Sequence, residues 1–147
     1  MKKVLGIVAL SISGMLVVMG MKNSSSGRIT DIKPTHQKPI TNGEKVYKKV
    51  CLSCHQADGS GVPNMTPPLI QTSFVLGDKE KLIHIVLDGL KNVDIDDQTY
   101  NNPMPALGSV LKDKEIADVL TYVRNSFGNK ASAVTVAEVK AVRGNMK

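Results

Sequence analysis

The stretch Cys51-Leu52-Ser53-Cys54-His55 contains the two cysteines of the 147-residue chain, three positions apart and followed directly by a histidine. Two thiols at this spacing near a helix end can both reach the vinyl groups on one edge of a porphyrin. The imidazole of the next residue then lies under the iron. This C-x-x-C-H pattern therefore predicts one covalently attached haem, with thioether bonds at Cys51 and Cys54 and an iron ligand at His55.

Two other uses of paired cysteines fit this sequence less well. A redox-active C-x-x-C disulfide usually lies in a βαβ unit, and no segment of the chain has the alternating pattern of a strand. A structural zinc site usually needs four ligands. Beyond the motif only His36 and His84 remain as further histidines, and neither has finger-like spacing.

One helix is predicted on the N-terminal side of the motif. Thr41-x-x-Glu44 has the pattern of a capping box, which places the helix over about 42–50. Tyr47 is one of its apolar positions. Gly43 lies four residues earlier and therefore on the same face of the helix.

Two main helices are predicted on the C-terminal side of the motif. Asp78 is placed to cap a helix over about 79–90, and Asp113 to cap one over about 114–127 that Gly128 ends. Their apolar residues recur every three or four positions: Leu82, Ile83, Val86, Leu87 and Leu90, then Ile116, Val119, Leu120, Val123 and Phe127.

The rest of this region is predicted to be mostly loop. Residues 56–77 and 91–108 are rich in Gly, Pro, Asn, Asp and Ser, and no segment is predicted as a strand. A second capping-box pattern, Thr135-x-x-Glu138, indicates one short helix to about residue 143. The sequence thus predicts an all-α domain with three main helices. Loops as long as these usually hold or cover something in a small domain.

The first residues of the chain point to export. Lys2 and Lys3 precede 18 uncharged residues, 4–21, that end at Lys22. A signal peptide has an apolar region of about 7–15 residues, whereas a membrane-spanning helix needs about 17–25. No Ala-x-Ala site follows, so residues 1–22 are interpreted either as a signal peptide or as an N-terminal membrane anchor. Both interpretations place the remainder in the periplasm or on the outer face of the cytoplasmic membrane; a buried core helix is a third, weaker one.

The segment that follows is polar and separates this start from the globular part. Residues 23–38 contain Ser, Gly and Pro without an apolar period and are predicted to be a flexible linker, which leaves 39–147 as the domain. Without Lys2, Lys3 and Lys22, 16 basic and 13 acidic residues remain, so the net charge falls from +6 to +3. With few aromatic residues and no long basic stripe, the chain gives no support for nucleic-acid binding.

These motifs together resemble one family. From about residue 43 to residue 143 the chain resembles the class I c-type cytochromes, especially the small cytochrome domains of periplasmic dehydrogenases and copper nitrite reductases. The matching segments are Gly43-x-x-x-Tyr47, the C-x-x-C-H motif, Pro67-Pro68-Leu69, Met104-Pro105 and residues 117–129, ADVLTYVRNSFGN. The resemblance implies the class I cytochrome c fold, in which three main helices and long loops surround one haem c.

The resemblance also implies roles for residues outside the C-x-x-C-H motif. A backbone carbonyl of the Pro67-Pro68 segment, preferably that of Pro67, would accept the second N–H of His55; the alternative is that these prolines only stiffen the loop. Tyr47 is also expected at the cofactor site. With Gly43, it is expected to pack where the first and last main helices cross.

The sixth ligand of the iron separates an electron carrier from an enzyme. The candidates are Met65, Met104, Met146, His36 and His84. Met65 lies ten residues after His55, in the loop on the same side of the haem, and the other three lie at the chain end, in the linker or on a polar helix face. Met104 lies between Pro103 and Pro105, whose fixed φ can hold its sulfur in place. The resemblance implies the same ligand; the alternative is that Met104 only fills a gap in its loop.

Ligation by His55 and Met104 would leave no open iron position for oxygen, peroxide or nitrite. We therefore expect no catalysis by the chain itself, but the transfer of single electrons between redox proteins such as a dehydrogenase, a reductase or an oxidase. Their docking is expected at the haem edge beside Lys45, Lys48 and Lys49. One alternative is a haem enzyme or gas sensor with an open or labile sixth position. Another is a subunit that mainly tethers a partner to the membrane.

Overall fold

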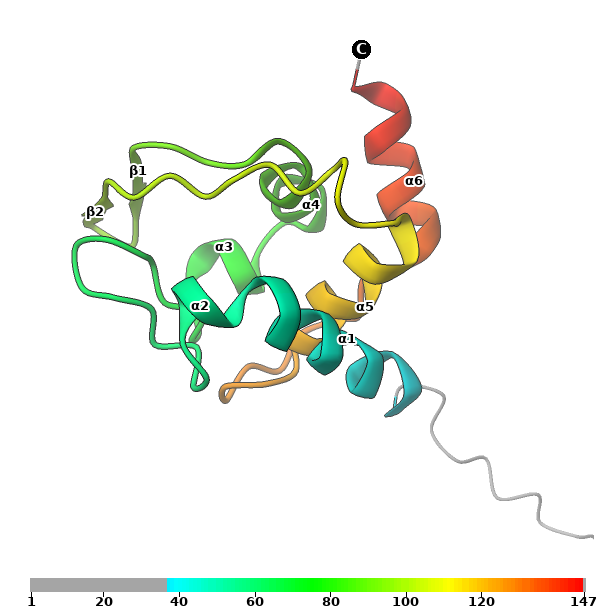
Figure 1. Cartoon of the computed structure of the whole chain (residues 1–147), viewed down its shortest axis with the longest axis horizontal. Coiled ribbons are helices and arrows are strands. Elements are labelled where there is room, and N and C mark those ends of the chain that lie inside the picture. Colours follow the sequence, from blue (N-terminus) through cyan, green and yellow to red (C-terminus); the bar gives the residue numbers. More distant parts are fainter. Residues whose placement is uncertain (1–36, 147) are drawn as a thin grey trace, which may run out of the picture. The chain divides into compact units, whose positions relative to one another are not determined.

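Residues 37–146 are the part of the chain that the structure, a computed structural model, describes (Figure 1). The predicted signal peptide or anchor, the linker up to residue 36 and the candidate ligand His36 lie outside the described residues. Within the described part, none of the helices has the length and apolar character that crossing a membrane requires.

The first helix, α1 (Gln37–Val50), begins earlier than predicted. The capping box at Thr41 and Glu44 is a wrong prediction, because the helix already includes both residues. Pro39 is tolerated in the first turn, where the missing N–H would have no partner within the helix. A single turn, α2 (Leu52–His55), continues directly from α1 and contains most of the cysteine motif.

The helices predicted over about 79–90 and 114–127 are largely confirmed. Helix α4 (Lys79–Asp88) is capped by Asp78, whose carboxylate accepts a hydrogen bond of 2.7 Å from the backbone N–H of Lys81. Helix α5 (Asp113–Val123) begins one residue before the predicted start and ends four before the predicted end. The predicted cap at Asp113 is wrong, because Asp113 lies inside the helix and Lys112 is its N-cap. Phe127 and Gly128 have positive φ values of 56° and 79°, so the chain turns away there.

The last helix, α6 (Val136–Asn145), confirms the second capping box. The Thr135 hydroxyl accepts a hydrogen bond of 3.2 Å from the N–H of Glu138, and the Glu138 carboxylate accepts one of 2.7 Å from the N–H of Thr135. The two residues thus satisfy each other's backbone donors at the helix start.

Three short elements lie in the segments predicted as loop. They are α3 (Ser73–Leu76), β1 (Val93–Ile95) and β2 (Gln98–Tyr100). The two strands form an antiparallel hairpin whose turn residues, Asp96 and Asp97, have φ values of 50° and 64°. Both conformations are ones that aspartate tolerates better than most residues. Strands of three residues are too short to show an alternating pattern, so the prediction of no strand is wrong here, although the fold is mostly helical.

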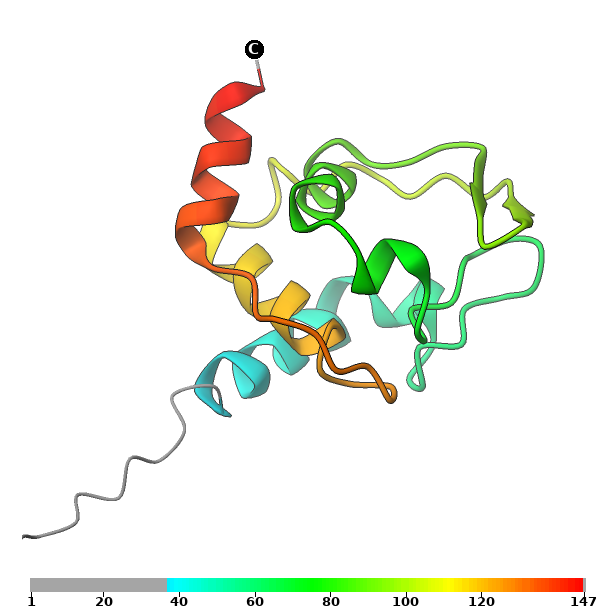
Figure 2. The same cartoon turned by 180° about the vertical axis from the view of Figure 1, so that it is seen from behind.

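The core forms where α1 crosses α5, and α6 packs against α4 and α5 (Figures 1 and 2). Gly43 lies at the crossing, where an added Cβ would come within 2.6 Å of the Tyr122 Cβ. Tyr47 packs between Tyr122 and Phe127, with ring centroids 5.5 and 5.4 Å away. The predicted packing of Gly43 and Tyr47 at the helix crossing is therefore confirmed.

Candidate functional site

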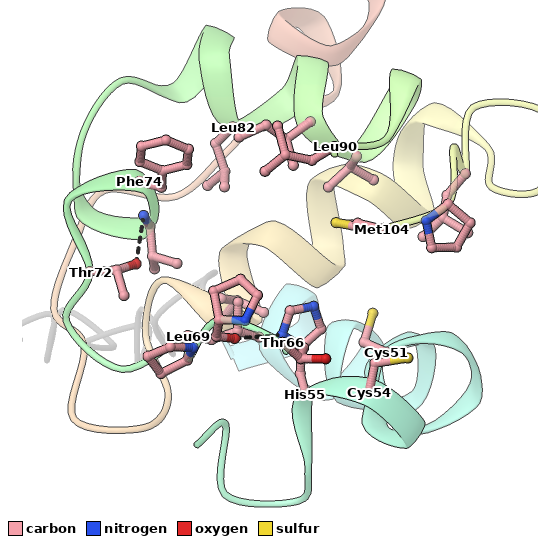
Figure 3. A pocket seen from close by; sticks show the side chains of 18 of the residues that line it. Cys51, Cys54, His55, Thr66, Leu69, Thr72, Phe74, Leu82, Leu90 and Met104 are labelled. Carbon is pink, nitrogen blue, oxygen red and sulfur yellow. Dashed lines mark hydrogen bonds between the residues drawn. The ribbon is translucent and has the colours of Figure 1, made fainter. Parts of the chain in front are cut away.

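A cavity with mainly apolar walls opens on the side of the fold that carries the cysteine motif (Figure 3). Its walls come from α2, α4, α5, the segment 66–75 and the segment 102–107. Aliphatic side chains of α4 and α5 supply one part of the lining, including Leu82, Val86, Val119, Leu120 and Val123. The helical stripes predicted from the sequence thus face not only one another but also this space.

Both cysteines of the motif line the cavity, and they are not joined by a disulfide. Cys51 directly follows α1 and is half-buried, whereas Cys54 lies in α2 and is exposed. Burial, and to a lesser degree the neighbouring Cys54, raises the pKa of the Cys51 thiol to about 11. The two thiols lie together at one edge of the cavity in Figure 3, as attachment to one edge of a porphyrin requires.

His55 extends from the end of α2 into the cavity and is 8% exposed (Figure 3). Its Nδ1 lies 3.1 Å from the carbonyl oxygen of Pro67. A carbonyl can only accept, so Nδ1 carries the proton and Nε2 keeps its lone pair for a metal. Burial lowers the pKa of the imidazole, against the opposing effect of the Pro67 hydrogen bond, and thus favours this neutral form. The hydrogen bond predicted between His55 and Pro67 is confirmed.

A buried asparagine holds the segment that presents the Pro67 carbonyl. The Asn129 amide donates hydrogen bonds of 2.7 Å to the Leu69 carbonyl and 2.8 Å to the Val123 carbonyl. Its Oδ1 accepts one of 2.7 Å from the N–H of Gln71. Asn129 therefore ties the loop after the motif to the end of α5. Sequence reasoning missed this role, although Asn129 directly follows Gly128 in a segment that matched the family.

Met104 lines the cavity from the segment after the hairpin, and its sulfur is directed towards the open centre of the site in Figure 3. Its backbone forms an isolated antiparallel bridge with Leu90, through N–H to carbonyl distances of 3.1 and 2.8 Å. Two residues earlier, the N–H of Asn102 donates to the Met65 carbonyl at 3.2 Å. Backbone hydrogen bonds thus hold this segment to Leu90, just after α4, and to Met65, in the loop after the cysteine motif.

The other described candidates for an iron ligand do not line this cavity. Met65 is 53% exposed. His84 lies 3.3 Å from Asp88 on α4, outside the cavity lining. Met146 is the C-cap of α6 and packs against the hydrophobic core. Of the candidate ligands that the structure describes, Met104 is the one placed to reach a group bound beside His55.

Tyr47 lies outside the cavity lining, unlike the other predicted site residues. Its hydroxyl donates a hydrogen bond of 2.6 Å to the carbonyl of Gln56, and burial raises the pKa of this phenol. Gln56 follows His55 directly and has a positive φ of 64°. Tyr47 therefore fixes the backbone of Gln56, the residue that directly follows His55.

The described residues fit a covalently bound haem. Two thiols lie at one edge of an apolar cavity, an imidazole with a free Nε2 enters it from α2, and a thioether enters it from the segment 102–107. Soft sulfur and imidazole nitrogen are both common haem-iron ligands. The aliphatic walls match the apolar faces of a porphyrin.

Comparisons with known proteins agree with this site. Residues 40–127 match the family model described as Cytochrome c. The chain is 34% identical over 112 residues to cytochrome c-552 of Thermus thermophilus, an alignment that covers 69% of this chain and 84% of the relative.

Two further relatives are subunits of larger assemblies. The chain is 36% identical over 104 residues to the gluconate 2-dehydrogenase cytochrome c subunit of Pantoea cypripedii. It is 34% identical over 103 residues to the alcohol dehydrogenase (quinone) cytochrome c subunit of Gluconacetobacter polyoxogenes. Each alignment covers 69% of this chain but only 24% and 22% of the respective relative, so the chain spans about a quarter of their length.

Proposed function

Since the chain belongs to the cytochrome c family, with the class I fold and one covalently bound haem c, we propose that it carries single electrons between redox proteins outside the cytoplasm. In this proposal the chain catalyses no conversion of a substrate itself. Its relatives include both cytochrome c-552 and cytochrome subunits of dehydrogenases.

One observation carries the proposal: the His55 imidazole and the Met104 sulfur enter the same cavity from different segments of the chain (Figure 3). We propose that these two side chains would ligate the iron and that Cys51 and Cys54 would form the thioethers. The protein would then supply every iron ligand outside the porphyrin, so no iron position would be open for a small substrate. Ligation by methionine and histidine also raises the reduction potential.

When bound, the haem supplies an iron that changes oxidation state by one electron. The protein residues would limit the structural change that accompanies electron transfer. His55 is fixed by the Pro67 carbonyl, Met104 by its bridge to Leu90, and the aliphatic walls exclude water. Side chains held in this way would move little when the electron is gained or lost, so the reorganisation energy of electron transfer would be small.

The redox partner would dock where the cofactor edge meets solvent, beside the exposed Cys54. Lys45, Lys48 and Lys49 are exposed in the C-terminal half of α1, which leads into the cysteine motif. Lys48 is paired with Glu44 at 2.6 Å, which leaves Lys45 and Lys49 as the less compensated charges. We propose a dehydrogenase as one such partner, because several relatives are named as cytochrome subunits of dehydrogenases. Steering by charge predicts that association slows as salt is added.

Export is part of the proposal and rests on the N-terminal segment. Lys2 and Lys3 followed by residues 4–21 would direct the chain across a membrane, either as a cleaved signal peptide or as a retained anchor. Fractionation of cells and the mass of the mature protein separate the two: a retained segment keeps full mass and sediments with membranes. Full mass in the cytoplasm would contradict export.

Absorption spectra test the ligand assignment. We expect the wild-type holoprotein to be low-spin, to show the weak methionine-to-iron charge-transfer band when oxidised, and to ignore carbon monoxide when reduced. Met104→Ala should lose the band and bind the gas. Met65→Ala is the matched control, because it removes an exposed methionine that does not line the cavity. A high-spin wild type that binds carbon monoxide readily would favour the haem enzyme or gas sensor instead.

A further inference from the structure

We propose that Gly89, at the end of α4, is the positioning residue for the Met104 ligand. Its missing side chain allows the end of the helix to lie directly against the backbone of residues 104–106. This inference rests on the proposed function, because it takes Met104 as the sixth ligand of the iron.

Gly89 lies in a crowded position, where a residue with a side chain would require the neighbouring backbone to move. It is the C-cap of α4, its N–H donates to the Ile85 carbonyl at 2.9 Å, and its φ is +81°. An added Cβ would lie 2.5 Å from the carbonyl oxygen of Met104, 2.9 Å from the nitrogen of Ala106 and 3.1 Å from the carbonyl carbon of Pro105. All three are backbone atoms, so no side-chain rotation relieves the contact.

Hydrogen bonds on both sides of this contact hold the same two segments together. Leu90, the next residue, exchanges both backbone hydrogen bonds with Met104. On the helix side, the N–H of Leu107 donates to the Val86 carbonyl at 2.9 Å, and the N–H of Gly108 to the Leu87 carbonyl at 3.1 Å. The Met104 backbone is therefore placed by the end of α4 and not by the flanking prolines alone.

A side chain at position 89 would have to push this segment away from the helix. The Met104 backbone would move with it, because Met104 is bridged to the residue next to Gly89. The sulfur would then no longer be held at the iron, and the sixth position would be weakened or opened. Loss of methionine ligation would also lower the reduction potential.

The test compares glycine variants in the full-length holoprotein. In Gly89→Ala we expect the methionine-to-iron band to be lost or strongly reduced. We also expect the affinity of the reduced protein for carbon monoxide to rise by about tenfold or more, since strain of this kind is commonly large enough for such a change. A fall in midpoint potential should accompany it.

Gly128→Ala is the matched control. Gly128 has nearly the same φ, +79°, but the nearest atom to an added Cβ is the Nε2 of Gln71 at 3.7 Å. This variant shares the backbone strain without crowding Met104, so it should keep the band. Gly89→Asn completes the set, because asparagine tolerates a positive φ but still carries a Cβ; it should lose the band as Gly89→Ala does.

A Gly89→Ala protein with the wild-type band and no carbon monoxide binding would overturn the inference while leaving the proposed function intact. A wild-type spectrum without the band would instead overturn the Met104 assignment, and the inference with it. If Gly89→Ala does not fold, amide exchange of the wild-type holoprotein decides. The N–H groups of Leu90 and Met104 should exchange slowly and together, and exchange as fast as that of an exposed loop would overturn the inference.

Discussion

Arg124 is a charged side chain buried inside the fold, with an exposed fraction of 3%. Its guanidinium donates hydrogen bonds to the carbonyls of Val75, Gly77 and Ser132, at 2.5, 3.2 and 2.8 Å. Burial lowers the pKa of this group, against the weaker opposing influence of Glu138 and Asp78. Arg124 thus joins the turn after α3 and the loop after α5 through backbone acceptors.

Replacing Arg124 should destabilise the protein strongly. In Arg124→Met three carbonyls lose their donor inside the fold, and we expect the free energy of unfolding to fall by about 3 kcal/mol. Urea denaturation of the holoprotein measures this. Arg124→Lys should recover part of the loss, because an ammonium reaches fewer of the acceptors. A loss below about 0.5 kcal/mol in Arg124→Met would mean that water replaces these contacts fully.

Asn129 should be costly to replace for a related reason. Asn129→Ala removes two donors and one acceptor for one buried and two partly buried backbone groups, and we expect a loss of about 2 kcal/mol in the free energy of unfolding. Asn125→Ala is the matched control, since this exposed asparagine donates one hydrogen bond, to the Thr121 carbonyl at 2.9 Å. Equal losses in the two variants would contradict the role given to Asn129.

The crossing of α1 and α5 depends on the glycine in α1. We expect Gly43→Ala to lower the free energy of unfolding by about 2–3 kcal/mol, because the new Cβ meets the Asp118 carbonyl and the Tyr122 Cβ and the helices must separate. Thermal unfolding followed by circular dichroism measures the loss. Gly144→Ala in α6 is the control, with no atom within 4 Å of the added Cβ. It should be neutral or slightly stabilising.

The hairpin of β1 and β2 is joined to α3 by one carboxylate. Asp96 accepts a hydrogen bond of 3.1 Å from the N–H of Ser73, and the contact with Ser73 lowers the pKa of Asp96 below its usual 3.8. Because the pKa of Asp96 is lower in the folded protein than in the unfolded one, the ionised carboxylate stabilises the fold at pH values above the unfolded-state pKa. This stabilisation is lost as the pH falls through the folded-state pKa. Stability measured from pH 5 downward should therefore fall less steeply in Asp96→Asn than in wild type. Identical pH profiles would show that this hydrogen bond does not form in solution.

The whole domain depends on the group that fills its cavity. The aliphatic side chains of α4 and α5 line the cavity that the haem would fill, and a domain of this size has little other core to rely on. We expect the chain without haem, as in a Cys51→Ala/Cys54→Ala variant, to lose most of its helical circular dichroism and its cooperative thermal transition. An apoprotein that unfolds like the holoprotein would show that the core is sufficient without haem.

Local signals in the sequence predicted much of this protein. Five consecutive residues, 51–55, indicated the cofactor, because attachment to one porphyrin edge depends on spacing within a single turn of helix. Periodic apolar residues and the caps at Asp78 and Thr135 predicted α4, α5 and α6, because these interactions join residues only three or four positions apart. The class I fold was implied by the resemblance of residues 43–143 to the class I c-type cytochromes, not by these local signals alone.

Other features required residues that are distant in the sequence to meet. Asn129 reaches a carbonyl 60 positions away and Arg124 one 49 positions away. Gly89 lies within the helix predicted over about 79–90, and its position matters because the backbone of residues 104–106 packs against it. Tyr47, expected at the cofactor, lies behind His55 instead. Local propensity and period report only on near neighbours along the chain, so contacts of this kind arise from the packing of the folded domain.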